Sequence, residues 1–242
     1  MQETSATYKR LLTAGAPKVV QTIIAGVTYG PARIESATIR SAMLLPDTLI
    51  GNCIAKELHL RLRDAGSGFN IPRMASIQMR YRLQNPDVVS DYSEWIPKGV
   101  YFIDTRDERN GVLSIDAFDP MLKTNVPFIG SDDQDQGFWP RSDMTIVAQI
   151  ASRIGVTVDE RTYAILTRGY QIQYPGYGNG AYTMREMLSQ IGIAYGGNWI
   201  VTDQNQLRLI ILGDIPSDQS NYLVTQNGDY IVIGGYRILV SR

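Results

Sequence analysis

The sequence predicts a mainly β protein: an antiparallel barrel or sandwich, a two-helix α+β insert, and part of a second β-barrel. Three observations predict it. Apolar and polar residues alternate with a period of two from Val19 to Asp119, two later segments carry apolar residues at helical spacing, and alternation returns after the second of them. With 242 residues and 27.0 kDa, the chain is long enough for one large domain or two small ones. We expect units at 1–120, 121–205 and 206–242.

The first unit contains several segments with strand periodicity. The clearest is Ile77–Leu83, whose basic residues Arg80 and Arg82 are expected to face outward or toward a lumen. Its expected core residues are Ile77, Met79, Tyr81 and Leu83. The other expected strands are Val19–Ala25, Ile34–Arg40, Ala55–Arg63, Gly99–Asp104 and Val112–Ala117. The pair Asn110-Gly111 lies between the last two, which is a strong signal for a hairpin.

The pattern changes near residue 120. Asp119–Lys123 is expected to form a short helical turn. A helix follows Ser142, a favourable N-cap residue, and ends at Gly155. A second helix begins at Thr183, which forms a capping box with Glu186, and ends at Gly196-Gly197. The Gly- and Tyr-rich segment between the helices, Tyr170–Gly180, is predicted to be a loop.

Strand patterns return after the second helix. Asn198–Asp203 and Gln206–Ile211 are expected to form a hairpin, followed by strands at Tyr222–Thr225, Tyr230–Ile233 and Tyr236–Val240. The apolar run Ile238–Val240 lies two residues from the end of the chain. Either a neighbour covers that strand, or the chain is a piece of a longer one.

Composition excludes several functional classes. The net charge of −1 argues against general affinity for nucleic acids. The single cysteine, Cys53, and the single histidine, His59, exclude a multi-cysteine zinc site and a redox pair, and leave little room for histidine-based catalysis. No apolar run is long enough to span a membrane, and no signal peptide is visible. We expect no cofactor and no metal.

No motif predicts an active site. His59 alternates outward with Glu57 and Arg61, and no nucleophile elbow is present. The acidic segment Asp132–Gly137 has the wrong spacing for a calcium loop. A glycosidase would need two carboxylates in a cleft, for which the candidates are Asp104, Asp107, Asp116 and Asp119. We expect that the protein is not an enzyme.

Two groups of residues are candidates for contact surfaces. Tyr174 and Tyr177 lie in the Gly- and Tyr-rich loop, and tyrosine is enriched in protein interfaces. Arg80 and Arg82 are the second group, and with Arg61 and Arg63 they are able to form a basic stripe. A solvated strand face is the simpler interpretation of these arginines. Open strand edges must be covered or blunted, so we also expect self-association through the edges of the β units.

Four blocks of the chain resemble a known family in order and spacing. They are Tyr92–Thr105, Leu113–Leu122, Thr183–Leu209 and Tyr236–Leu239. Together they resemble the tail-tip hub, or tail-associated, proteins of siphophages and prophages. That family is related in fold to the baseplate hubs of contractile tails.

The resemblance implies a homotrimeric hub that closes the distal end of the tail tube. Each protomer of such a hub carries two tube-like β-barrels with a helical insert between them, so that three chains mimic a six-fold ring. The implied partners are the distal tail protein, the tail tube and the tape-measure protein, with DNA passing through the lumen. The implied location is the virion, after assembly in the cytoplasm of the host bacterium. Only 35 residues follow Leu207, so the second barrel is reduced or the chain is truncated.

The alternative hypothesis is a tail protein that binds or hydrolyses cell-wall carbohydrate of the host. Binding would require Tyr174 and Tyr177 on an exposed platform. Hydrolysis would require two of the four aspartates to meet in a cleft.

Overall fold

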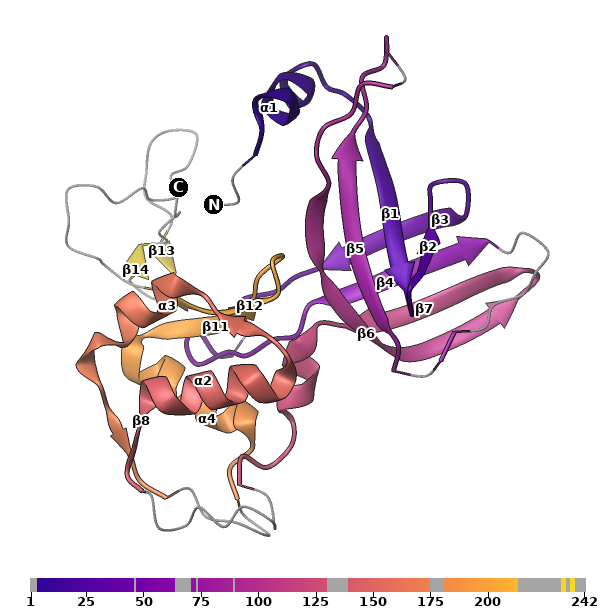
Figure 1. Cartoon of the computed structure of the whole chain (residues 1–242). Helices are drawn as coiled ribbons and strands as arrows, with labels where there is room; N and C mark the ends of the chain where they lie inside the picture. Colours follow the sequence, from indigo (N-terminus) through magenta and orange to yellow (C-terminus); the bar gives the residue numbers. More distant parts are fainter. Residues whose placement is uncertain are drawn as a thin grey trace.

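The computed structural model describes residues 4–45, 47–63, 71–72, 74–88, 90–129, 139–174 and 181–212, together with the backbone of 232–233 and 236–237. Two units lie side by side (Figure 1). The first is built from strands β1 to β7. The second contains helices α2 to α4 and the hairpin of β11 and β12.

Seven antiparallel strands form the sheet of the first unit, in the order β2-β1-β5-β6-β7-β4-β3. Their bounds are β1 Lys18–Ile24, β2 Val27–Tyr29, β3 Ile34–Arg40, β4 Glu57–Arg63, β5 Ser76–Leu83, β6 Ile96–Arg109 and β7 Val112–Phe118. The predicted hairpin between β6 and β7 is confirmed, with Asn110 at φ 52° and Gly111 at φ 71°.

The long strand β6 folds the sheet into two facing halves. Its first part, Ile96–Phe102, pairs with β5, and its second part, Phe102–Arg109, pairs with β7 after a register shift between Ile103 and Thr105. The core lies between the halves. The result is a sandwich-like unit in which β2 and β3 remain sheet edges, so the order does not close into a barrel.

The core of this unit confirms the predicted register of β5. Ile77 and Met79 face inward, and they join one hydrophobic core with residues of the opposite half, among them Leu58, Leu60 and Ile115. Leu83 is also buried, but it packs with Ile96 under the N-terminal helix α1 (Ala6–Thr13), which the sequence analysis did not predict. Tyr81 is half-buried there, and its hydroxyl lies 2.6 Å from that of Tyr8 on α1.

The second unit packs helices on a three-stranded sheet. Its elements are η1 Pro120–Thr124, β8 Arg141–Ser142, α2 Asp143–Ile154, β9 Thr157–Val158, α3 Glu160–Ile165, η3 Leu166–Arg168, β10 Gln171–Ile172, α4 Met184–Tyr195, β11 Gly197–Val201 and β12 Gln206–Ile211. Helices α2 and α4 contribute Ile146, Ile150 and Leu188 to a core that Trp199 and Leu209 complete from the sheet.

The predicted helix boundaries are confirmed by their caps. The Ser142 hydroxyl accepts a hydrogen bond from Thr145 N, and Gly155 ends α2 in the left-handed conformation. Thr183 and Glu186 form the capping box at the start of α4, and Gly196 ends that helix. Helix α3 and the parallel pairing of β9 with β12 were not predicted.

The C-terminal expectations are tested only in part. Strand β12 pairs with β11, as predicted for the hairpin, and joins the sheet of the second unit. Farther along, β13 (Val232–Ile233) pairs with β14 (Tyr236–Arg237), both inside predicted strands. The predicted strand Tyr222–Thr225 lies outside the described residues, and a second barrel over 206–242 stays a prediction.

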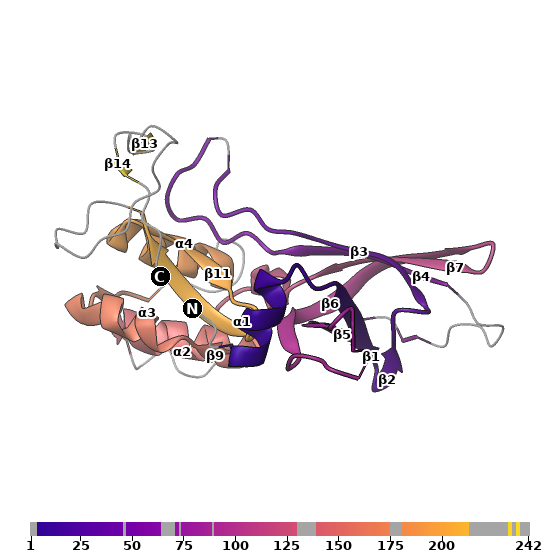
Figure 2. The ribbon, with the colours of Figure 1, turned by 90° about the horizontal axis from the view of Figure 1, so that it is seen from above.

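The connection between β3 and β4 leaves the first unit and extends over the second (Figure 2). Gly51 N donates to Gly197 O at 2.9 Å, and Trp199 N donates to Asn52 O at 2.8 Å. The side chain of Asn198 continues this pairing, accepting from Asn52 N and donating to Leu49 O, both at 2.8 Å. This connection therefore adds a short parallel segment to β11, and Cys53 enters the core of the second unit.

Three glycines, Gly51, Gly192 and Gly197, make that close approach possible. A Cβ atom on Gly192 of α4 would lie 2.9 Å from Gly197 O and 3.3 Å from Gly51 Cα. Both atoms belong to the backbone, so neither moves aside cheaply.

Gly192→Ala is therefore expected to lower the free energy of unfolding by about 1–2 kcal/mol. Overpacking costs ~1–3 kcal/mol, and the better helix propensity of alanine returns at most ~1 kcal/mol. Urea unfolding followed by circular dichroism measures the change. Gly30→Ala is the matched control, since a Cβ there meets nothing within 4 Å. A stabilised Gly192→Ala protein would contradict the close packing of the two segments.

Candidate interaction surfaces

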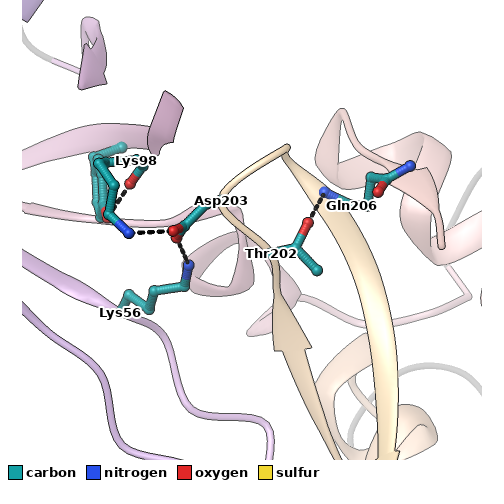
Figure 3. A network of polar contacts seen from close by, with 6 residues as sticks. Lys56, Lys98, Thr202, Asp203 and Gln206 are labelled. Atoms are coloured by element: carbon teal, nitrogen blue, oxygen red, sulfur yellow. Dashed lines mark hydrogen bonds and ion pairs between the residues drawn. The ribbon is translucent and has the colours of Figure 1, made fainter. Parts of the chain in front are cut away.

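A partly buried ion triad holds the two units together. Asp203, in the turn between β11 and β12, accepts hydrogen bonds from Lys56 Nζ at 2.9 Å and from Lys98 Nζ (Figure 3). Both lysines belong to the first unit, one just before β4 and the other on β6. Burial by itself raises the pKa of Asp203, but the hydrogen bonds from Lys98 and Lys56 outweigh it and hold the pKa below its ordinary value. Asp203 therefore stays ionised and bridges the units.

A second carboxylate at this junction, Asp119, has no ion-pair partner among the described residues. Asp119 is buried, and its Oδ1 accepts a hydrogen bond from Met121 N at 3.0 Å, which caps η1. Its Oδ2 has no hydrogen-bond partner among the described residues. Burial raises the pKa of Asp119 to about 6, although the nearby Lys56 and Arg185 oppose that shift. The cap explains its place in the sequence, since an aspartate before proline favours a helix start.

The four aspartates considered for glycoside hydrolysis do not share a cleft. Asp119 is buried, whereas Asp104, Asp107 and Asp116 are exposed on the first unit. Asp107 pairs with Arg109 at 2.7 Å, and Asp116 accepts from Thr105. The arrangement is that of a solvated sheet face.

The single histidine and the single cysteine occupy structural positions. His59 faces outward on β4, as predicted, with Nδ1 2.6 Å from Asp116 Oδ1. Burial raises the pKa of the Cys53 thiol to about 12, so it remains protonated and unreactive. Among the described residues, no three His, Cys, Asp or Glu side chains are placed to hold a metal ion. The acidic segment Asp132–Gly137 lies outside the described residues.

Arg80 and Arg82 project from the outer face of β5, and both are half-buried. Their guanidinium groups stack on aromatic rings of the loop that precedes β6. Arg80 lies 4.7 Å and Arg82 4.6 Å from the centre of the Trp95 ring, and Arg82 lies 3.5 Å from that of Tyr92. The basic stripe that was considered with Arg61 and Arg63 does not form, because β6 and β7 separate β4 from β5 in the sheet.

Tyr174 lines a cavity of about 330 Å³ in the second unit. Tyr170 and Tyr182 contribute further aromatic rings, and Gln173 and Gln190 contribute amide groups. The Tyr174 ring is half-buried and packs edge-on against Trp139, with 5.8 Å between the ring centres. Tyr174 is therefore part of a pocket wall. Tyr177 lies outside the described residues.

The longest open edge of the first unit is β3. It ends the strand order, and its outer side has no backbone partner among the described residues. Thr38 on this strand is exposed and lies opposite His59 of β4. None of the described helices is long and apolar enough to cross a membrane.

No local pattern in the sequence indicates the partners at these places. Lys98 and Lys56 are 105 and 147 residues from Asp203, and no local pattern links them. Trp95 belongs to one of the family-like blocks, and its position there does not indicate its contact with the arginines. Alternation along β5 indicates which face the arginines occupy, but not what covers them.

No protein-family model matches the sequence, and no curated protein is similar to it in sequence. Three solved structures are similar to it in structure. A 43 kDa tail protein of prophage MuSo2 from Shewanella oneidensis superposes with a TM-score of 0.50 at 14% identity, over 81% of this chain and 56% of that one. A tail protein from Neisseria meningitidis covers 83% of this chain and 52% of its own length, with a TM-score of 0.47 at 12% identity. The prophage tail protein gp18 from Listeria monocytogenes covers 87% and 64%, with a TM-score of 0.45 at 9% identity.

The two-unit fold is thus that of the Shewanella prophage tail protein. The chain spans between about half and two thirds of the length of these structures, 56%, 52% and 64% in turn.

Asp119 predicts a specific dependence of stability on pH. Its pKa is 3.8 in a free side chain and about 6 in the fold. The stability that it contributes is complete below pH 3.8 and is lost as pH rises toward 6, because the folded protein must then hold a buried charge. Asp119→Asn keeps the capping oxygen and is expected to remove this decrease.

Urea midpoints measured at pH 4, 5, 6 and 7 test this prediction. The wild type should lose stability over that range by more than the Asp119→Asn protein. Asp107→Asn, an exposed carboxylate, is the control and should follow the wild type. Asp203 acts with the opposite sign and at lower pH, since its pKa is lowered. Parallel curves for Asp119→Asn and the wild type would show that Asp119 is ionised at no cost.

Proposed function

We propose that this chain is a structural component of a phage tail tip or baseplate hub. In this role it forms a ring that closes the distal tail tube and adapts the tube to the apparatus for host recognition and penetration. The observation that carries the proposal is the shared arrangement of both units with a prophage tail protein, at a TM-score of 0.50 over 81% of the chain. A structural role also agrees with the scattered candidate aspartates, since Asp119 is buried and Asp104, Asp107 and Asp116 are solvated.

The open edge of β3 supports assembly with other subunits. An unpaired strand of seven residues presents backbone donors and acceptors that a neighbouring chain is able to pair. We propose a homotrimer, with the distal tail protein, the tail tube and the tape-measure protein as neighbours, and a lumen through which DNA passes. The proposed location is the virion, after assembly in the host bacterial cytoplasm.

Negative-stain imaging of the purified 242-residue chain tests the ring directly, with light scattering to give its mass. Rings with a central hole and the mass of a trimer are expected. A stable monomer at micromolar concentration would count against a preformed ring.

Thr38→Lys tests whether β3 is the contact. A lysine at this exposed edge position blocks strand pairing between subunits but does not disturb the core. The association constant of each contact is expected to fall by about tenfold, which corresponds to ~1.4 kcal/mol. Ser114→Lys is the matched control, because Ser114 is exposed on β7, an internal strand. Equal assembly of both variants would move the contact away from β3.

Carbohydrate binding is a second candidate, favoured by the cavity that Tyr170, Tyr174 and Tyr182 line. Its volume of about 330 Å³ lies within the range of ligand sites, and aromatic rings with amide side chains suit a sugar ring. Tyr174 and Tyr177 are the residues proposed to meet it.

Titration with soluble cell-wall glycan fragments, followed by nuclear magnetic resonance, tests this candidate. Tyr182→Ala removes an exposed ring at the mouth of the cavity and is expected to weaken binding at least about fivefold. Tyr163→Ala, an exposed tyrosine on α3, is the control. Binding that Tyr182→Ala leaves unchanged would reject the cavity as the sugar site.

A further inference from the structure

Arg80 and Arg82 form a pair of cations with a fixed geometry. They lie two residues apart on one face of β5, which separates them by about 6.5 Å along the strand. Trp95 lies within 4.7 Å of both guanidinium groups, and Tyr92 contacts the second. Stacking on these rings limits the motion of both side chains. It occupies the faces of each guanidinium and does not block the N–H groups at its edge.

The charge of this pair is not neutralised by the described part of the chain. Arg80 Nε donates to the neutral Gln21 Oε1 at 2.7 Å. Arg82 makes no hydrogen bond or ion pair with a described residue, and its Nε is buried without a partner. The stacked rings therefore hold the Arg82 guanidinium, but they supply no hydrogen-bond acceptor to its buried Nε, which is unfavourable.

Two carboxylates of the same loop, those of Asp91 and Glu94, are engaged elsewhere. Asp91 accepts from Arg10 and from Asn85, both at 2.8 Å. Glu94 accepts from Ser5 N at 2.7 Å. Both therefore tie the loop to its surroundings and to the N-terminal region, and the two stacked arginines are left available.

We propose that Arg80 and Arg82 are a docking site for an extended acidic segment of another protein chain, with carboxylates on alternate residues. Carboxylates spaced two residues apart in an extended strand repeat at the same interval as the two arginines. Each planar guanidinium binds a carboxylate through two parallel hydrogen bonds. Trp, Tyr and Arg are also the residues that dominate the energy of protein interfaces.

A nucleic acid fits this surface less well. Bases bind single-strand sites by stacking on free aromatic faces, and here guanidinium groups occupy the faces of Trp95 and Tyr92. The affinity of a nucleic acid also increases with the number of phosphates that cations neutralise, and a pair of arginines in a chain of net charge −1 neutralises few. The proposed site does not depend on a role in phage tails.

The test is fluorescence anisotropy with a labelled ten-residue peptide, Gly-Ser-Val-Glu-Thr-Glu-Val-Glu-Ser-Gly, against the whole chain titrated to millimolar concentration. A peptide with glutamine at the three glutamate positions is its matched partner. The glutamate peptide is expected to bind at least about tenfold more tightly, and less tightly as salt increases. Equal binding of the two peptides would overturn the proposal.

Arg82→Gln and Arg80→Gln locate the site. Each is expected to weaken binding of the glutamate peptide by about tenfold. Arg63→Gln, which removes the same charge from an exposed position at the end of β4, should change binding less than about twofold. Equal losses in all three variants would mean attraction by net charge and would reject a built site.

Two further measurements keep the result decisive. Thermal unfolding shows whether each variant is folded. If Arg82→Gln is not folded, Arg82→Lys is used in its place, because it keeps the charge but loses the planar pairing with a carboxylate. An unchanged affinity of Arg82→Lys would then contradict the proposal. A single-stranded oligonucleotide of twenty nucleotides is offered as competitor. Tighter binding of this oligonucleotide, lost in Arg82→Gln, would assign the surface to nucleic acid instead.

Discussion

The pairing of Leu49–Cys53 with β11 is the constraint on which the arrangement of this molecule depends. It joins the backbone of the first unit to the sheet of the second through hydrogen bonds of 2.8–2.9 Å. The same segment places Cys53 in the second core, so that core is incomplete without the first unit. Gly51, Gly192 and Gly197 permit the approach, since a side chain at any of them would meet a neighbouring atom closer than 3 Å.

Two carboxylates at this junction illustrate how partners decide the cost of burial. Asp203 meets two lysines and stays ionised with a lowered pKa. Asp119 is more deeply buried, lacks a partner for one oxygen, and has a raised pKa. Desolvation acts on both in the same direction, and only the charged hydrogen bonds reverse it. Asp203 joins the two units, whereas Asp119 lowers the stability of the fold above the pH at which it ionises.

The bend in β6 gives the first unit two different surfaces. One half of the sandwich presents the stacked arginines on β5, and the other half ends in the open edge of β3. A ring of identical subunits needs two different complementary patches on each subunit, because its contacts are head to tail. The two halves of the sandwich offer separate surfaces to the proposed ring.

Local signals determined much of the fold. The Asn110-Gly111 turn, the cap at Ser142 and the capping box at Thr183 depend on residues within four positions of one another, so sequence alone identifies them. Alternation along β5 determined that Met79 faces the core and Arg80 faces outward. The short helices α1 and α3 were missed, since few residues carry their pattern.

Only the tertiary structure decided which faces and charges meet. A period of two indicates the buried face of a strand but not its neighbours, so it could not reveal that β6 and β7 separate Arg61 from Arg80. It could not pair Lys56 with Asp203, 147 residues away, or bring Trp95 against two arginines. Such contacts arise from the packing of whole elements, whose energy depends on positions that no short stretch of sequence encodes.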